Sequence, residues 1–143
     1  LSWATFSGVT GAVTLNPDND VDDHIHVTIP VATLVASNKL LTWQLKSDMF
    51  FDAEHYPTIE FISSRVVAQG AGRFRVFGTL TVRNIARPVI LEAVVKDPHA
   101  QAPTLDATTA ISRASYGMDK FALVVDDRIA IAIAIQTNKV PSS

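Results

Sequence analysis

The sequence predicts an all-β protein, an antiparallel lipocalin-like barrel of about eight strands with one or two short helices. Most of the chain alternates apolar and polar residues with a period of two, which is typical of strands that cover a core. Near-helical spacing occurs only between residues 34 and 56. The connections between predicted strands are mostly short, which favours antiparallel pairing. With 143 residues, 48% of them hydrophobic, the chain is expected to form one domain over residues 1–143.

The first third of the chain predicts three strands and a helical region. Residues 1–6 and 12–16 are short strands around a turn at 7–11, and the turn formers at 17–20 make a loop. Residues 24–31 alternate again, with Pro30 at a strand end or edge. Ser37 or Asn38 caps a helix, and Ser47 could cap a further turn that Pro57 ends.

The clearest strand pattern is a hairpin over residues 73–95, preceded by a strand that begins at 59 and turns at 70–72. The apolar face of its first strand is Phe74, Val76, Leu80 and Val82. Arg83 and Asn84 form the turn, since Asn tolerates a left-handed backbone. Pro88 lacks an amide donor and is expected at the start of the return strand, not inside it. The return strand continues the inward face with Val89, Leu91, Ala93 and Val95.

The last third predicts two more strands. Residues 97–104 form a loop, and the next strand places Leu105, Ala107 and Ile111 on one face, which Arg113 continues. Residues 115–125 hold a helical turn. Residues 128–136 alternate Ile with Ala and close the sheet.

Composition excludes several classes of function. The chain has no cysteine, so disulfides, thiol catalysis and cysteine-ligated zinc are excluded. A net charge of −2 offers no electrostatic case for nucleic acid or an anionic membrane. No stretch approaches the roughly 18 apolar residues of a spanning helix, and no signal peptide is visible at the start.

A sheet of this kind hides its edges by closing into a barrel, whose interior can be filled or can hold one apolar ligand. Inward Gly78, Ala93 and Ala107 are expected to leave room. The alternative is a sandwich packed solid by its own side chains.

Several ordered motifs give the chain a resemblance to a known family. They are LKSDMFFD at 45–52, YPTIEF at 56–61, GTLTV at 78–82, RPV at 87–89, ISR at 111–113, YG at 116–117 and DRI at 127–129. In this succession the chain resembles the YceI-like, polyisoprenoid-binding, lipocalin-like family over residues 6–136.

The resemblance implies an eight-stranded antiparallel barrel around a hydrophobic cavity, in carriers of isoprenoid lipids that include quinones. It also implies export to the bacterial periplasm or secretion. The family normally begins with a strand that carries an Asp and a His-Ser pair, which nothing before Leu1 supplies. Either the chain is truncated, or the barrel is open along one side. A second copy could fill such a seam and form a homodimer. The family often has Gly at the position of Asn84, a change that the turn should tolerate.

Catalytic and metal chemistry find little support. His24 and His26 share one face of a strand, with Asp22 on the same side if the strand starts early, and two such side chains can bind a metal. A zinc site needs a third and a fourth ligand, however, and polar residues normally lie on the outward face of a strand. No nucleophile elbow, phosphate loop or dinucleotide motif occurs. Asp22-Asp23 and Asp126-Asp127 are adjacent pairs, typical of turns.

Arg113 continues an inward face, and a buried guanidinium needs partners. One interpretation is a structural salt bridge near the barrel end, with Asp48 or Asp119. The other is a contact with a lipid head group at the cavity mouth.

The sequence therefore predicts non-enzymatic binding of an isoprenoid or quinone tail, with no cofactor and no metal required. The residues expected to line the tail site are Phe61, Phe74, Val76, Leu80, Leu91, Ile111, Ile131 and Ile133. Those expected nearer the mouth are Trp43, Phe50, Met118 and Arg113. Two rivals remain: an enzyme for a small apolar substrate that uses Arg113, and a stress-related module that binds a partner protein and has a filled core.

Overall fold

The computed structural model describes residues 2–16, 19–120 and 126–137, and nine strands in this part of the chain form one curled sheet. The strands are β1 (Ser2–Phe6), β2 (Thr10–Thr14), β3 (His24–Pro30), β4 (Val35–Ala36), β5 (Thr58–Gly70), β6 (Arg73–Val82), β7 (Ile85–Lys96), β8 (Thr104–Ser112) and β9 (Arg128–Gln136). The helical segments are α1 (Lys39–Lys46) and the 3₁₀ turns η1 (Val31–Thr33) and η2 (Ala114–Tyr116). The predicted all-β, barrel-like class is confirmed. Of the helical turn expected at 115–125, residues 121–125 lie outside the described residues.

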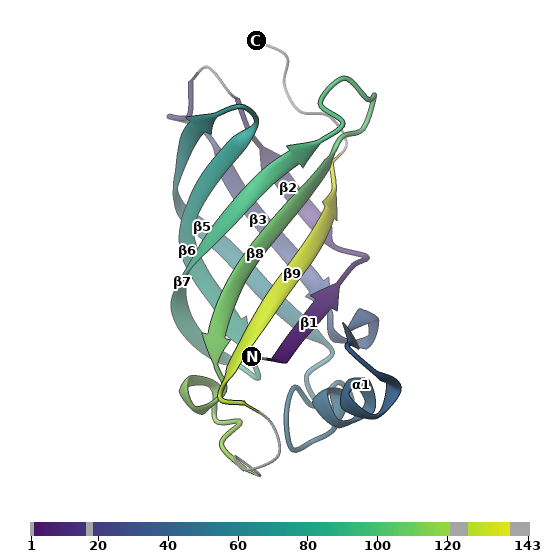
Figure 1. Ribbon diagram of the computed structural model, residues 1–143. Helices are drawn as coiled ribbons and strands as arrows, with labels where there is room; N and C mark the ends of the chain where they lie inside the picture. The colour runs from purple at the N-terminus through teal and green to yellow at the C-terminus, as the bar shows by residue number, and fades with distance from the viewer. Residues whose placement is uncertain (1, 17–18, 121–125, 138–143) are drawn as a thin grey trace.

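The sheet runs in the order β2-β3-β5-β6-β7-β8-β9-β1-β4 (Figure 1). From β5 to β9 each strand pairs antiparallel with the next, as predicted. β1 is an exception, because it pairs parallel with β9. Only three residues separate β1 from β2, although β2 stands at the opposite end of the sheet order. This short link draws the two ends of the sheet together and curls it.

The tight turn between β6 and β7 is the one expected from sequence. Arg83 and Asn84 both have positive φ, 52° and 60°. Two consecutive left-handed residues are what a two-residue hairpin turn requires, because their twist matches that of the flanking strands.

The apolar positions of the strands face a common interior. In β6 and β9 every second residue is buried, which reproduces the alternation in the sequence. At one end Phe6 packs edge-on against Phe51, with ring centroids 5.8 Å apart.

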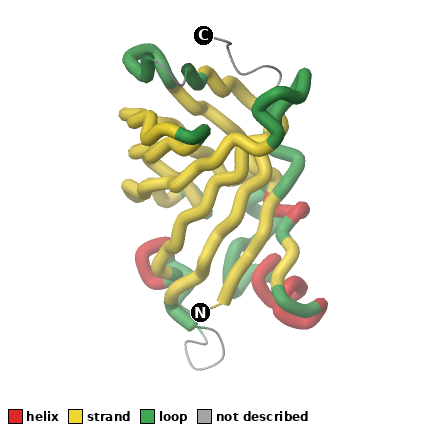
Figure 2. Tube along the Cα trace, turned by 45° about the horizontal axis from the view of Figure 1, so that its top comes forward, coloured by secondary structure: helices red, strands yellow, loops and turns green. Residues whose placement is uncertain are grey.

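The helical segments gather at one end of the barrel (Figure 2). Phe50, Phe51, Tyr116 and Met118 are buried at this end. The Tyr116 hydroxyl donates a hydrogen bond to the Leu80 carbonyl, 3.0 Å away, and burial raises the pKa of Tyr116 to about 12. The segments that follow α1 and β8 therefore seal this end. No helix in the described part of the chain is long and apolar enough to cross a membrane.

Asn38 caps α1, one of the two predicted caps. Its side-chain oxygen accepts a hydrogen bond from the Leu41 amide at 2.8 Å. We expect Asn38→Ala to lower the free energy of unfolding by about 1 kcal/mol, because a helix-terminal amide loses its partner. Urea denaturation measures the change, and Asn38→Asp is the control that should retain most of the stability. Equal stability of the alanine variant and the parent would contradict the assignment.

Candidate functional site

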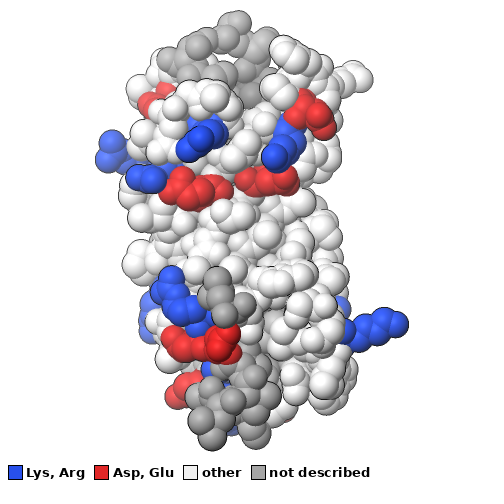
Figure 3. Space-filling model, in the orientation of Figure 1, with Lys and Arg blue, Asp and Glu red and all other residues white. Residues whose placement is uncertain are grey.

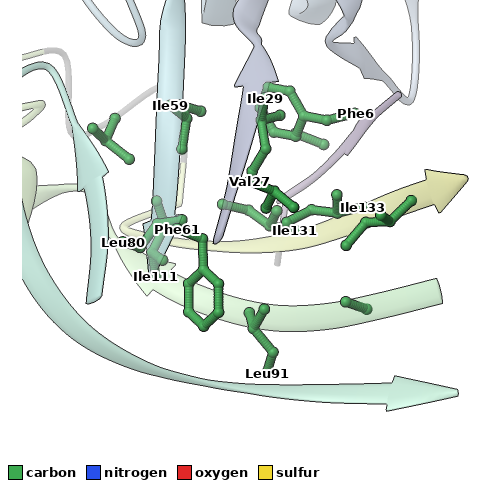
Figure 4. Close-up of a cluster of buried hydrophobic side chains, with 14 of the residues drawn as sticks. Phe6, Val27, Ile29, Ile59, Phe61, Leu80, Leu91, Ile111, Ile131 and Ile133 are labelled. Atoms are coloured by element: carbon green, nitrogen blue, oxygen red, sulfur yellow. The ribbon is translucent and has the colours of Figure 1, made fainter. Parts of the chain in front are cut away.

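The barrel interior is lined by apolar side chains from many strands (Figure 4). All eight residues predicted to line a tail site are buried there, each with 0–3% of its surface exposed. Exposure this low means that the side chains lie against one another. In this conformation the centre of the barrel is closed around its own residues.

The space over Gly78, expected to be room for a guest, is occupied by Phe61. A methyl group built on Gly78 would lie 2.6 Å from Cζ of Phe61 and 2.4 Å from the carbonyl oxygen of Ile62. Glycine is required here because the Phe61 ring approaches the backbone of β6 so closely. The prediction that Gly78 leaves empty space is therefore wrong, and Phe61 is the side chain that fills the space.

Room for a guest occurs where strands separate, and one such place lies between β7 and β8. The two strands pair only from Glu92 with Thr108 to Lys96 with Thr104. Among the described strands, the first half of β7 pairs with β6 alone, and η2 packs beside it near Ile85. A pocket of about 780 Å³ opens in this gap, which we call the β7–β8 window. Its lining residues are Ser64, Phe77, Gly78, Pro88, Val89, Ile90, Glu92, Thr108, Thr109, Ala110 and Arg128.

Pro88 explains in part why the strands separate. We expected it at the start of the return strand, but β7 begins at Ile85 and Pro88 lies inside it, opposite Thr79. Proline has no amide hydrogen, so it cannot donate to a ladder and is tolerated in a strand only at an edge. Because β8 does not pair with this part of β7, the strand is an edge there.

The window lies at the outer surface and borders the core at Val89. Val89 is half-buried and packs on the core cluster, whereas Ile90 is exposed on the outside. Glu92 at the rim accepts a 2.8 Å ion-pair hydrogen bond from Arg75. Charged side chains on this face gather toward the two ends of the molecule and leave an uncharged band between them (Figure 3).

A second opening lies between β2 and the end of β9. Within the described residues, β1 pairs with β9 as far as Ile133, and β2 pairs only with β3. A pocket of about 490 Å³ lies here, with buried Val27 and Ile135 among its lining residues. The barrel is therefore open at this seam, which is one of the two alternatives expected from the sequence. That a second copy fills it stays a prediction.

Arg113 is 1% exposed and is held by the backbone. Its Nε donates a 2.7 Å hydrogen bond to the Asp126 carbonyl, and its Nη1 donates to the Met118 carbonyl. The guanidinium carbon lies 5.4 Å from the centroid of the Phe50 ring, a cation–π distance. The residue was correctly predicted to be buried near the barrel end. The partners described for Arg113 are backbone carbonyls, and a salt bridge with Asp48 or Asp119 stays a prediction.

Phe50 and Met118 are buried beside Arg113, whereas Trp43 is exposed. The place of Trp43 near a cavity mouth stays a prediction, but the residue is 66% exposed on α1 and does not line the buried interior. The reason is helical geometry: Leu45 is the buried residue of α1, and a residue two positions away points to the opposite side.

Asp52 and His55 form a salt bridge on the turn after α1, with Nδ1 and Oδ1 2.8 Å apart. Burial opposes ionisation of Asp52, but hydrogen bonds from the His55 side chain and amide outweigh it and lower the pKa of this carboxyl. The Asp52 carboxylate, through its hydrogen bond and its charge, raises the pKa of His55.

These shifts predict a pH-dependent contribution to stability. Because the pKa of Asp52 is lowered on folding, this group stabilises the protein at pH values above its ordinary pKa of 3.8. That stability is lost as the pH falls through the pKa of the folded state. Because the pKa of His55 is raised on folding, this group stabilises the protein at pH values below its ordinary pKa of 6.5. That stability is lost as the pH rises through the pKa of the folded state. We therefore expect His55→Gln to lower the melting temperature at about pH 5.5 more than at about pH 8.5. His99→Gln, in an exposed loop, is the control; an equal loss at both pH values would refute the coupling.

The histidines His24 and His26 on the outward face of β3 are not part of a cluster of metal ligands among the described residues. His26 lies 3.3 Å from Glu60, and both side chains are about half exposed. Among the described residues, no group of three or more His, Cys, Asp or Glu side chains is placed to hold a metal ion.

Comparison with known proteins agrees with the fold. The pattern of the YceI-like domain matches residues 2–137. The chain belongs to the YceI-like family. Among curated relatives of this YceI-like chain, the UPF0312 protein plu2095 of Photorhabdus laumondii is 33% identical over 103 residues, 68% of this chain and 53% of that protein. Protein YceI of Escherichia coli O157:H7 is 30% identical over 94 residues, 64% of this chain and 49% of that protein. The chain thus spans about half the length of the curated relatives it matches.

Solved structures show the same YceI-like fold. The YceI protein of Campylobacter jejuni has a TM-score of 0.72 at 19% identity, with 96% of this chain and 85% of that chain covered. BcnA of Burkholderia cenocepacia has a TM-score of 0.72 at 25% identity, with 87% and 80% covered. The relatives named here are all bacterial, and none of their names is the name of an enzyme.

Proposed function

We propose that this YceI-like protein binds the apolar tail of a lipid and catalyses no reaction on it. The observation that carries the proposal is a barrel wall of apolar side chains that comes within reach of the outside through the β7–β8 window. Val89 and Thr109 lie in the window lining between the surface and the core. A tail that enters here displaces side chains of the interior rather than water.

Burial alone provides enough driving force for such binding. Each methylene removed from water contributes about 0.8 kcal/mol. A tail of several isoprene units therefore gains a large free energy, from which the cost of immobilising the tail and of moving Phe61 is subtracted. The choice of an isoprenoid, such as a quinone tail, rests on the family resemblance, as does a periplasmic or secreted location.

The polar end of the guest would remain at the window rim. Thr108 and Arg128 line this rim and offer a hydroxyl and a guanidinium to a carbonyl-bearing head group. Arg113 is fully buried and already engaged, which supports neither head-group contact nor catalysis by this residue.

Native mass spectrometry and organic extraction of the purified protein test the proposal, followed by titration with decylubiquinone. We expect a co-purified lipid, or uptake of the quinone at one molecule per chain. Ala110→Trp should block the window and reduce uptake, whereas Ala132→Trp, on β9 outside both openings, should not.

The closed interior favours one rival, a module with a filled core that binds a partner protein. Recovery of no lipid, together with no uptake of quinone by the parent protein, would decide for that rival. Equal uptake of quinone by the two tryptophan variants would instead show that the lipid does not enter through the β7–β8 window.

A further inference from the structure

The outer side of α1 carries an apolar groove that nothing in the barrel covers. The groove measures about 500 Å³ and lies between β4 and α1. Its lining residues are Val35, Ala36, Asn38, Lys39, Thr42, Trp43 and Lys46. Val35 is 56% exposed, and Leu40 and Trp43 are each 66% exposed.

These apolar residues form one surface. Leu40 and Trp43 are three positions apart on α1 and are therefore neighbours on the helix. Val35 lies on the outward side of β4, and Trp3, 44% exposed, lies on the outward side of the paired strand β1. We call Trp3, Val35, Leu40 and Trp43 the α1 face. Large exposed apolar side chains gathered in this way mark a binding surface.

The charged residues that line this groove are both basic. Lys39 and Lys46 both line the groove, and no carboxylate lines it. No ion pair of either lysine is found among the described residues. In Figure 3 the region over α1 is uncharged apart from basic side chains at its edge. The net charge of −2, which offered no case for an anionic membrane, conceals this local basic site.

We propose that the α1 face docks on the surface of an anionic lipid bilayer. Tryptophan favours the membrane–water interface, because its ring is apolar and its N–H is polar. Lysine can extend its apolar stem along the surface and place its ammonium among anionic head groups. Trp43 with Leu40 supplies the apolar contact, and Lys39 with Lys46 supplies the charge.

A bilayer fits this surface better than a second copy of the chain does. A two-fold dimer would place the α1 face against itself and bring Lys39 and Lys46 of one copy toward those of the other. Like charges in an interface oppose association. The docking does not depend on what the barrel interior holds, because none of the α1 face residues lines the β7–β8 window.

Vesicle flotation tests the proposal, with vesicles of phosphatidylcholine and phosphatidylglycerol in equal amounts and vesicles of phosphatidylcholine alone. We expect the protein to float with the first and to bind the second much more weakly. Replacing both lysines, Lys39→Gln with Lys46→Gln, should weaken binding about 25-fold, since each basic residue near the surface contributes roughly fivefold. Lys96→Gln, on β7, is the matched control and should bind like the parent.

Fluorescence locates the contact. The chain has two tryptophans, so Trp3→Phe leaves Trp43 as the only one. Its emission should shift to shorter wavelength when anionic vesicles are added. The double glutamine variant should still take up decylubiquinone from solution, which separates failure of docking from failure of tail binding.

Three results would overturn the proposal. One is equal flotation with both vesicle types, and another is an unshifted Trp43 emission on bound vesicles. The third is burial of Trp43 in a dimer or a protein complex at equilibrium without lipid, seen by sedimentation together with fluorescence, which would assign the α1 face to a protein partner.

Discussion

Phe61→Ala should lower the free energy of unfolding by about 3–5 kcal/mol, the usual cost of removing a fully buried ring. Phe61 is 0% exposed and its ring lies directly over Gly78. The substitution leaves a cavity in the barrel centre. Because Gly78 has no side chain, the lost volume is not filled from that side. Urea denaturation of the parent and the variant measures the loss.

The same cavity should improve lipid binding, because Phe61 is the side chain that a tail must displace. We therefore expect Phe61→Ala to take up decylubiquinone more tightly than the parent and to recover stability in its presence. A ligand at 100 times its dissociation constant stabilises the folded state by about 2.7 kcal/mol. The parent should recover less, since part of its binding energy moves the ring.

Phe51→Ala is the matched control for Phe61. Phe51 is also 0% exposed, but it packs on Phe6 at the sealed end of the barrel. Its removal should cost a similar free energy and leave quinone uptake unchanged. If the two variants respond alike to quinone, or if neither responds, the barrel centre is not the tail site.

Much of this barrel follows from alternation alone. Phe74 and Val76 are inward in β6 because a period of two fixes which face each side chain takes, and burial of one face fixes the register. Asn84 likewise identifies its turn, because few residues adopt the left-handed conformation that the turn needs.

The sequence does not predict how far each pair of strands stays hydrogen-bonded. Alternation reports the face of each residue but not which neighbour a strand keeps along its whole length. The β7–β8 window therefore could not be predicted from periodicity. Pro88 could have indicated this window, because a proline inside a continuous strand pattern indicates that the strand is an edge there.

Side-chain partners are harder to predict than faces. Trp43 has apolar neighbours in the sequence, but α1 buries Leu45, and this orientation of the helix leaves Trp43 on the exposed side. For Arg113 the sequence indicated a buried cation, and carboxylates were the obvious partners. Two partners of its guanidinium are the carbonyls of Asp126 and Met118, and a sequence pattern does not show which backbone carbonyls lie nearby.

Arg113→Met should therefore destabilise the protein by about 3 kcal/mol. Methionine fills similar space beside Phe50 but cannot donate to the carbonyls of Asp126 and Met118. A buried acceptor that loses its partner costs about 1–3 kcal/mol. Arg113→Lys should recover part of the loss, since a single ammonium keeps the charge but lacks the fork that reaches both carbonyls.

Quinone uptake separates the structural role of Arg113 from the other two interpretations. If Arg113 only ties the ends of β8 and β9 to the turn at Met118, Arg113→Met should bind decylubiquinone with the affinity of the parent, measured where both are folded. A head-group contact would show the reverse, with little loss of stability and much weaker binding. An enzyme would lose turnover on a small apolar substrate while its fold survived. Since the guanidinium is fully buried and already engaged by the backbone, the first outcome is the one expected.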